Sequence, residues 1–412
     1  MTDTTPSSPG RGLARFPRPL RAFLVTSFQS SLGNEMAYVA LLLLAYEQTK
    51  SGWAITGLLI AEFLPGLLLA GAAGALADRG SRRTLVVATD VVRCAAYAGL
   101  AFSPSITVTL VLATVASVGQ TVFRPASRSA IPSLTDEDGI GGAMGALSFT
   151  GSVAGTAGPL LAGAILLAGG PSTVLLVNAA TFLVSAMVLA RLPLDRAPAE
   201  AEEGDEDVAH PDGLRGTVRL LGSLGSVPAV FVAGVGATFA FAMINVAEPL
   251  LVRDTLGGDD AAFALLVALF GAGATVGSAL ARTRLSLMFV AGAGSVGTVG
   301  LTAAAGSVGV AGVLFAVSGL FAGLFITTED RLLATLVPQG VQGRVYGFKD
   351  ALESAAFLVA YVIAGGLAAV TDPPTVFVVS AATALVLGVA ALRWVARPAP
   401  AAALGAPPTA DA

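Results

Sequence analysis

Long apolar stretches recur along almost the whole chain, and they constrain its fold more than any other feature. A helix needs about 20 apolar residues to cross roughly 30 Å of hydrocarbon. Stretches of this kind run from Arg21 to Tyr46, Trp53 to Leu76, Leu85 to Phe102, Ile106 to Phe123, Ile140 to Ala168, Ser172 to Leu192, Pro228 to Val252, Ala261 to Ala281, Leu285 to Ala305, Val308 to Thr328, Tyr346 to Val370 and Thr375 to Val395. Charged residues make up only 12% of the chain, against about 25% in soluble domains. The sequence therefore predicts an all-α membrane protein with twelve transmembrane helices.

The distribution of basic residues predicts how these helices cross the membrane. Lys and Arg accumulate in the cytoplasmic loops that flank membrane spans. With twelve spans, 20 of the 23 Lys and Arg residues fall on one side, Lys50 and Arg253 fall on the other, and Arg93 lies within a span. We therefore expect both termini in the cytoplasm. The abundance of Ala and Gly is typical of a GC-rich bacterial genome, and we expect the chain in a bacterial cytoplasmic (inner) membrane.

An acidic stretch divides the apolar pattern nearly in half. It carries Glu200, Glu202, Glu203, Asp205, Glu206 and Asp207, and is too charged to be buried. We expect a cytoplasmic tail over 1–20, a six-helix bundle over 21–192, a cytoplasmic acidic linker over 193–216, a second six-helix bundle over 217–396 and a disordered tail over 397–412. The halves resemble each other in sequence, since Gly74–Arg79 matches Gly277–Arg282 at an offset of about two hundred residues. They are predicted to form two pseudo-symmetric bundles.

The residue inventory argues against several classes of function. Cys94 and His210 are the only residues of their kinds, so one chain cannot assemble a zinc cluster, a haem ligand pair or a disulfide framework. No basic patch favours nucleic acid. Neither Lys50 nor Lys349 follows a G-x-x-x-x-G loop, and no nucleophile with a base is visible. We expect no enzyme activity, no cofactor and no metal.

The link after the second span carries a recognisable motif. It reads Gly74-Ala-Leu-Ala-Asp78-Arg79-Gly-Ser81-Arg82-Arg83 and resembles the G-x-L-a-D-r-x-G-r-r signature of the major facilitator superfamily, with Ser81 in place of a glycine. The resemblance implies the major facilitator fold and a conformational latch, in which Gly74 permits close helix contact and Asp78 pairs with the arginines and with the start of the eleventh span, where Asp350 is the nearest acid. The same charges also fit a simple positive-inside stop signal without a gating role.

The fifth span carries a second motif. Gly151, Gly155, Gly158-Pro159 and Gly163 resemble the G-x-x-x-G-P-x-x-G-G signature of antiporters. Small residues at this spacing let helices approach closely, and a proline bends a helix, so we expect a helix bend at Gly155, Gly158, Pro159 and Gly163. Generic packing in a glycine-rich bundle is the alternative.

Further segments narrow the resemblance. Val122 to Ala126 with Ile131-Pro132, and Val337-Pro338 with Gly343 to Gly347, resemble the subfamily that contains exporters of enterobactin and macrolides. The fourth span lacks the arginine of a third family signature, because Val115 occupies its place near Gly119. Coupling therefore need not follow the scheme that uses that arginine.

Ionisable residues within the spans are functional candidates, because an unpaired charge at the midplane costs several kcal/mol. Glu35, beside Gly33 and Asn34, lies near the midplane of the first span, and Glu62 lies in the outer half of the second. A lone carboxyl group in hydrocarbon can take up a proton at physiological pH, as a proton carrier must. We interpret both as proton-coupling or substrate-binding residues, although each carboxyl could instead be hydrogen-bonded to a neighbouring helix.

The remaining charged and polar residues of the spans have weaker interpretations. Asp90 and Arg93 share a helix face and predict a structural ion pair. Asn245 and Tyr361 are candidates for the substrate cavity, together with Asn34. Glu248, Glu329 and Glu353 lie toward helix ends, so we expect them at the membrane interface.

Together these features predict a multidrug-type efflux antiporter. It would export a small amphipathic molecule, such as a drug, siderophore or natural product, by proton-coupled alternating access, with small molecule, protons and lipid bilayer as partners and a monomer as the expected state. The few embedded cations argue mildly against a highly anionic substrate. An importer or uncoupled facilitator fits the same motifs, and a non-transporting receptor or scaffold is the alternative from another class.

Overall fold

The computed structural model describes residues 16–194, 213–338 and 341–395, within which every regular element is a helix. Most of the predicted acidic linker and most of both predicted tails lie outside these ranges. The side chains of Asp78 and Arg79, two members of the predicted latch, also lie outside the described residues.

The N-terminal half comprises the helices from α1 to α5. Their bounds are α1 (Arg18–Thr49), α2 (Gly52–Arg79), α3 (Arg82–Leu100), α4 (Ile106–Ser129), the short η2 (Ile131–Ser133) and α5 (Glu137–Leu189). The helix α5 has 53 residues, which is roughly 80 Å of helix at 1.5 Å per residue and far more than a bilayer needs. It turns at Gly170, whose φ of 69° suits a residue without a Cβ. Its two arms correspond to the predicted fifth and sixth spans.

The C-terminal half begins with a short helix and continues with six long ones. The bounds are α6 (Gly213–Ser223), α7 (Val227–Leu250), the π-helical η3 (Leu251–Thr255), α8 (Asp260–Leu280), α9 (Leu285–Thr302), α10 (Val308–Leu336), α11 (Gln342–Val370) and α12 (Pro373–Val395). Residues 213–216, which were expected to belong to the linker, form the first turn of α6.

Among the described residues, nine helices are long and apolar enough to cross a membrane. One of them is α5, whose two arms each have the length of a span. The helices α1 and α3, which carry charged residues within their length, are not among the nine, and including them gives the twelve predicted spans.

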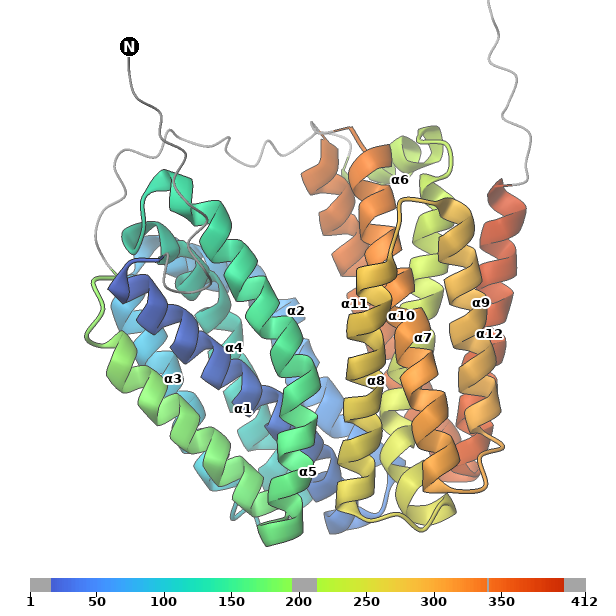
Figure 1. Cartoon of the computed structure of the whole chain (residues 1–412), viewed down its shortest axis with the longest axis horizontal. Coiled ribbons are helices and arrows are strands. Elements are labelled where there is room, and N and C mark those ends of the chain that lie inside the picture. Colours follow the sequence, from blue (N-terminus) through green and yellow to red (C-terminus); the bar gives the residue numbers. More distant parts are fainter. Residues whose placement is uncertain (1–15, 195–212, 339–340, 396–412) are drawn as a thin grey trace, which may run out of the picture.

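The two halves form separate bundles that lean together at one end (Figure 1). We call the end where α1 begins, α12 ends and α6 lies the linker end, and the opposite end, formed by the α1–α2 and α7–α8 turns, the far end. In Figure 1 the bundles diverge toward the linker end. The contacts between the halves are mainly those of α5 with α8 and of α2 with α11.

Candidate functional site

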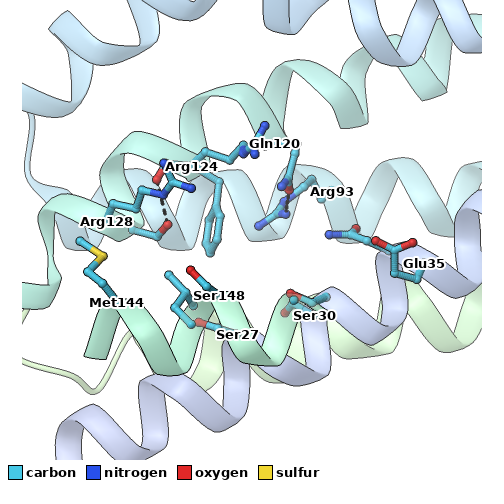
Figure 2. A pocket seen from close by; sticks show the side chains of 15 residues that line it. Ser27, Ser30, Glu35, Arg93, Gln120, Arg124, Arg128, Met144 and Ser148 are labelled. Carbon is cyan, nitrogen blue, oxygen red and sulfur yellow. Dashed lines mark hydrogen bonds between the residues drawn. The ribbon is translucent and has the colours of Figure 1, made fainter. Parts of the chain in front are cut away.

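A cavity of about 530 Å³ lies within the N-terminal half, between α1, α3, α4 and α5. Arginines and Gln120 line one side of it, and Ser27, Ser30 and Ser148 line the opposite side (Figure 2). Glu35 lies at one end of the cavity, away from Arg124 and Arg128. The volume lies in the range of pockets that hold drug-sized ligands, about 300–1,000 Å³.

The predicted ion pair of Asp90 and Arg93 is present in the wall of this cavity. One guanidinium nitrogen of Arg93 contacts Asp90, and another donates to the Gln120 side-chain oxygen. The guanidinium also lies 4.2 Å and 4.3 Å from the ring centres of Phe123 and Phe182, within cation–π range. Only 1% of Arg93 is exposed. Arg93 therefore both pairs with Asp90 and lines the cavity. The sequence predicted only the ion pair.

Glu35 connects the cavity with the glycine motif of α5. It lines the cavity beside Asn34. A Cβ atom on Gly158 would collide with the Glu35 Cβ and would lie 3.2 Å from the Leu32 carbonyl oxygen. The absence of a side chain at Gly158 therefore lets α5 cross α1 directly at Glu35.

Two other motif residues of α5, Gly155 and Gly163, lie against α8 of the C-terminal half, whereas Gly151 lines the cavity. A Cβ on Gly163 would contact Ala264 of α8 at 3.2 Å, and a Cβ on Gly271 of α8 would lie 2.9 Å from the Gly155 carbonyl oxygen. Helix α5 continues through Pro159, and its non-helical residue is Gly170. The predicted bend at Pro159 stays a prediction.

Carboxyl groups from both halves, buried at Glu248 and half-buried at Glu35 and Glu62, meet beyond the cavity, in what we call the junction cluster: Glu35, Tyr38, Glu62, Asn245, Glu248 and Tyr361. Tyr38 interacts electrostatically with the three glutamates and with Tyr361. The side chains of Asn245 and Tyr361 interact, and the Tyr361 carbonyl oxygen accepts a hydrogen bond of 2.9 Å from Thr56. The structure thus brings four of the predicted coupling and cavity residues into one cluster.

The expectation for Glu248 is wrong. Only 8% of it is exposed, and its Oε1 atom has no hydrogen-bond partner among the described residues. Its position toward the end of α7 suggested an interfacial residue, but this end of α7 is buried by other helices, which include α11 and α12 of its own half and α1 and α2 of the N-terminal half. Tertiary packing across the halves is not visible in a local pattern.

Glu329 is likewise buried and not interfacial, with 3% of its surface exposed. A Cβ on Gly234 of α7 would collide with its carboxylate. Lys349 of α11 lies near it, with its Nζ atom 3.8 Å from Glu329, 3.9 Å from Asp330 and 3.0 Å from Glu353. The charge of this lysine offsets the burial of the glutamate.

At the linker end, Gly74 of the predicted latch has open space around it. A Cβ on Gly74 would meet nothing within 4 Å in the described part of the chain, and the same holds for Gly347. Arg83 donates to the Ala190 carbonyl oxygen within its own half, Arg82 is half-buried and Asp350 is exposed. The predicted pairing of the latch with Asp350 stays a prediction for a state closed at this end.

At the far end, the halves are in contact. Tyr46 donates a hydrogen bond to Asp254, and the neighbouring Arg253 lies 5.8 Å from the Tyr46 ring centre and pairs with Asp260 at 3.0 Å. Asp254 and Arg253 belong to the π-helical η3. Such π-helical turns are frequent at functional sites, and no sequence motif marked this one.

The sequence is similar to known families over nearly its whole length. A model of the Major Facilitator Superfamily matches residues 23–311 and 230–410. The chain belongs to the Major Facilitator Superfamily. It is therefore a multi-pass membrane transporter for a small molecule and not an enzyme, and the predicted fold class is confirmed.

Two relatives come from Bacillus subtilis (strain 168). The uncharacterized MFS-type transporter YfiS is 28% identical over 381 residues, which cover 86% of this chain and 87% of YfiS. The uncharacterized MFS-type transporter YhjO is 28% identical over 182 residues, which cover 43% of this chain and 45% of YhjO.

Solved structures show the same fold at low identity. The nucleoside transporter NupG superposes with a TM-score of 0.74 at 12% identity, over 93% of this chain and 100% of NupG. A bacterial homologue of the iron transporter ferroportin, in an inward-facing state, gives 0.70 at 16% identity, over 92% of this chain and 99% of that one.

Two residues of the junction cluster carried a signal that sequence reasoning missed. Tyr38 lies three residues after Glu35, and Glu248 lies three residues after Asn245, so each shares a helix face with a predicted residue. For the cavity arginines Arg124 and Arg128 the signal was ambiguous, because basic residues at the end of a span are explained by topology alone.

Proposed function

We propose that this transporter exports a small amphipathic molecule in exchange for protons, by alternating access between its two halves. The observation that carries the proposal is the junction cluster. Its three glutamates come from α1, α2 and α7, and among the described residues none of them forms an ion pair with a cation. A carboxyl group that is removed from water and has no cation beside it has a raised pKa, so it can bind and release a proton near neutral pH.

The location of the cluster favours coupling to domain motion. Glu35 and Glu62 belong to the N-terminal half and Glu248 to the C-terminal half, so separation of the halves at the far end would expose all three to water. A proton taken up there and released at the linker end would bias the conformational equilibrium. The resemblance to exporters of enterobactin and macrolides supports export as the direction.

In this proposal the linker end faces the cytoplasm of a bacterium. The bias of Lys and Arg toward this end supports it. Cysteines introduced at Gly204 and at Gly258 test it with an impermeant thiol reagent on intact cells. We expect labelling of Gly258→Cys alone, and equal labelling of both positions would contradict the proposed topology.

The proposed coupling is tested in two steps. A thermal-shift screen of the purified protein first identifies a bound compound, since a ligand of the folded state raises its apparent stability. Proton-driven uptake of that compound into everted vesicles is then measured for Glu35→Gln, Glu62→Gln and Glu248→Gln. We expect uptake to lose its dependence on the proton gradient, whereas Glu47→Gln, an exposed residue at the far end of α1, should retain it. Full coupling in the triple variant would reject the proposal.

A further inference from the structure

The cavity between α1, α3, α4 and α5 has an uneven distribution of charge that the proposed coupling does not use. Among the described residues, three arginines line it, Arg93, Arg124 and Arg128, and one acid does, Glu35. Arg124 and Arg128 form no ion pair with any described residue. Figure 2 shows Arg128 and Glu35 at opposite ends of the cavity, with Arg93 and Gln120 between them.

Topology explains only part of this charge. Arg124 and Arg128 lie in the last two turns of α4, where basic residues are common. Arg93, however, is eleven residues into α3, which is roughly 16 Å from its start at 1.5 Å per residue. A buried arginine at this depth is costly unless it has a structural or binding role.

The cavity wall also contains hydrogen-bond donors without acceptors. The Nε atom of Arg93 and the hydroxyl of Ser30 are buried and have no partner among the described residues. Gln120 uses its oxygen to accept from Arg93, which leaves its amide group to donate. Buried donors without acceptors cost free energy, and the amide group of Gln120, which lines the cavity, is available to the acceptor oxygen of a ligand.

The two ends of the cavity are separated by the length of a small molecule. Ser27 and Glu35 bound the stretch of α1 that lines it, and eight residues of helix rise roughly 12 Å. On α4, Gln120 and Arg128 are also eight residues apart. The wall therefore offers cations and donors over most of its length and one carboxylate at the end near the junction cluster.

We propose that this cavity binds a bipolar molecule, with an anionic group such as a carboxylate or phosphate at Arg124 and Arg128 and an ammonium group at Glu35. The inference rests on the proposed function, because the bound molecule is the transported one. The ammonium group and a proton then compete for Glu35, and antiport requires such competition. This also agrees with the argument against a highly anionic substrate, since the molecule has an ammonium group that offsets its anion.

The test uses three probes that share one ring system. They are 4′-(aminomethyl)biphenyl-4-carboxylate, biphenyl-4-carboxylate and biphenyl-4-ylmethylamine. Their affinities for the full-length protein in phosphatidylcholine nanodiscs are measured from probe fluorescence. We expect the bipolar probe to bind about tenfold more tightly than either of the others, since a hydrogen bond to a charged group contributes about 1.5–3 kcal/mol. Equal affinity for all three, or no binding of the bipolar probe, would overturn the inference.

Variants assign the two ends. In Arg124→Gln/Arg128→Gln, we expect at least about tenfold weaker binding of both carboxylate-bearing probes and unchanged binding of the amine. In Glu35→Gln, the bipolar probe and the amine should weaken while the carboxylate probe does not. Arg124→Lys/Arg128→Lys keeps the charge and should retain most of the affinity, which guards against a folding defect in the glutamine variant.

A matched control removes two cations from the same end of the molecule. Arg282 and Arg284 are exposed at the linker end of the C-terminal half and line a separate depression. Arg282→Gln/Arg284→Gln should leave all three affinities unchanged. If this variant lost as much affinity as Arg124→Gln/Arg128→Gln, the effect would come from general surface charge, and the inference would be overturned. If the probes fail but proton-driven uptake of a screened compound persists, only this inference falls. If the probes bind as expected but no uptake depends on protons, only the proposed function falls.

Discussion

The far end and the linker end of the interface between α2 and α11 differ in the space around their glycines. At the far end, a Cβ on Gly52 would lie 2.9 Å from the Ala368 Cβ, and one on Gly365 would collide with Thr56. At the linker end, a Cβ on Gly74 or Gly347 would meet nothing within 4 Å in the described chain. The same helix pair is therefore closed at one end and open at the other, as one state of an alternating-access cycle requires.

A covalent link across the far end should have the largest effect. Gly52→Cys/Ala368→Cys, made in a Cys94→Ser background, places two Cβ atoms slightly closer than the about 3.5–4.5 Å found in disulfides. We expect ready oxidation, nearly complete loss of transport, and recovery with a reductant. Gly74→Cys/Gly347→Cys is the matched pair at the linker end and should not cross-link in the state described here. Transport that continues in the oxidised far-end variant would contradict the need for this end to open.

Larger side chains at the two ends should separate folding from motion. The valine side chain of Gly365→Val would overlap with Thr56. We therefore expect a loss of about 1–3 kcal/mol in the free energy of unfolding, typical of overpacking. Gly74→Val extends into open space and should leave the thermal stability unchanged, yet block transport by preventing closure of the linker end. Thermal unfolding in detergent and vesicle uptake measure the two effects. The comparison would fail if Gly74→Val were the less stable variant.

Loss of the tyrosine hydroxyl at the far end should shift the conformational equilibrium. Tyr46→Phe removes the hydrogen bond to Asp254, and a bond to a charged acceptor contributes about 1.5–3 kcal/mol. We expect roughly a tenfold or larger increase in the population open at the far end. The rate at which an impermeant thiol reagent labels Gly258→Cys measures it in the Cys94→Ser background. An unchanged rate would show that this contact does not hold the far end closed.

A neutral hydrogen bond at the same interface provides the smallest effect. Thr56 donates to the Tyr361 carbonyl oxygen at 2.9 Å, and Thr56→Val removes this bond while keeping the shape of the side chain. A neutral bond contributes about 1 kcal/mol, so the labelling rate should rise about fivefold, less than for Tyr46→Phe. A larger effect than that of Tyr46→Phe would reverse the proposed order of these contacts.

The sequence predicted the fold well because hydrophobicity over long stretches determines it. Twelve apolar stretches, an acidic division and two motifs were sufficient for the architecture. Gly170 is one example, since it divides α5 into two arms that correspond to the predicted stretches Ile140 to Ala168 and Ser172 to Leu192. The register of one helix against another, as at Gly158 and Glu35, depends on packing that no local pattern specifies.

The functional residues were predicted less completely, because their role depends on contacts between distant segments. Glu35, Glu62, Asn245 and Tyr361 were identified individually from polarity within spans, and the structure places them in one cluster. Glu248 was misplaced because its burial comes from helices that are distant in the sequence. Asp254 was missed because a polar residue beside a turn has no distinctive pattern, although its partner Tyr46 is 208 residues away.

The central claim is that opening at one end accompanies closing at the other. Paired spin labels measure it directly, with one pair at Leu76 and Asp350 near the linker end and one pair at Lys50 and Asp259 near the far end, all exposed residues. On raising the pH in nanodiscs, which deprotonates the junction carboxyls and favours their exposure to water, we predict a shorter linker-end distance together with a longer far-end distance, and neither change in the variant Glu35→Gln/Glu62→Gln/Glu248→Gln. Distances that change in the same direction at both ends, or at one end alone, would contradict the account.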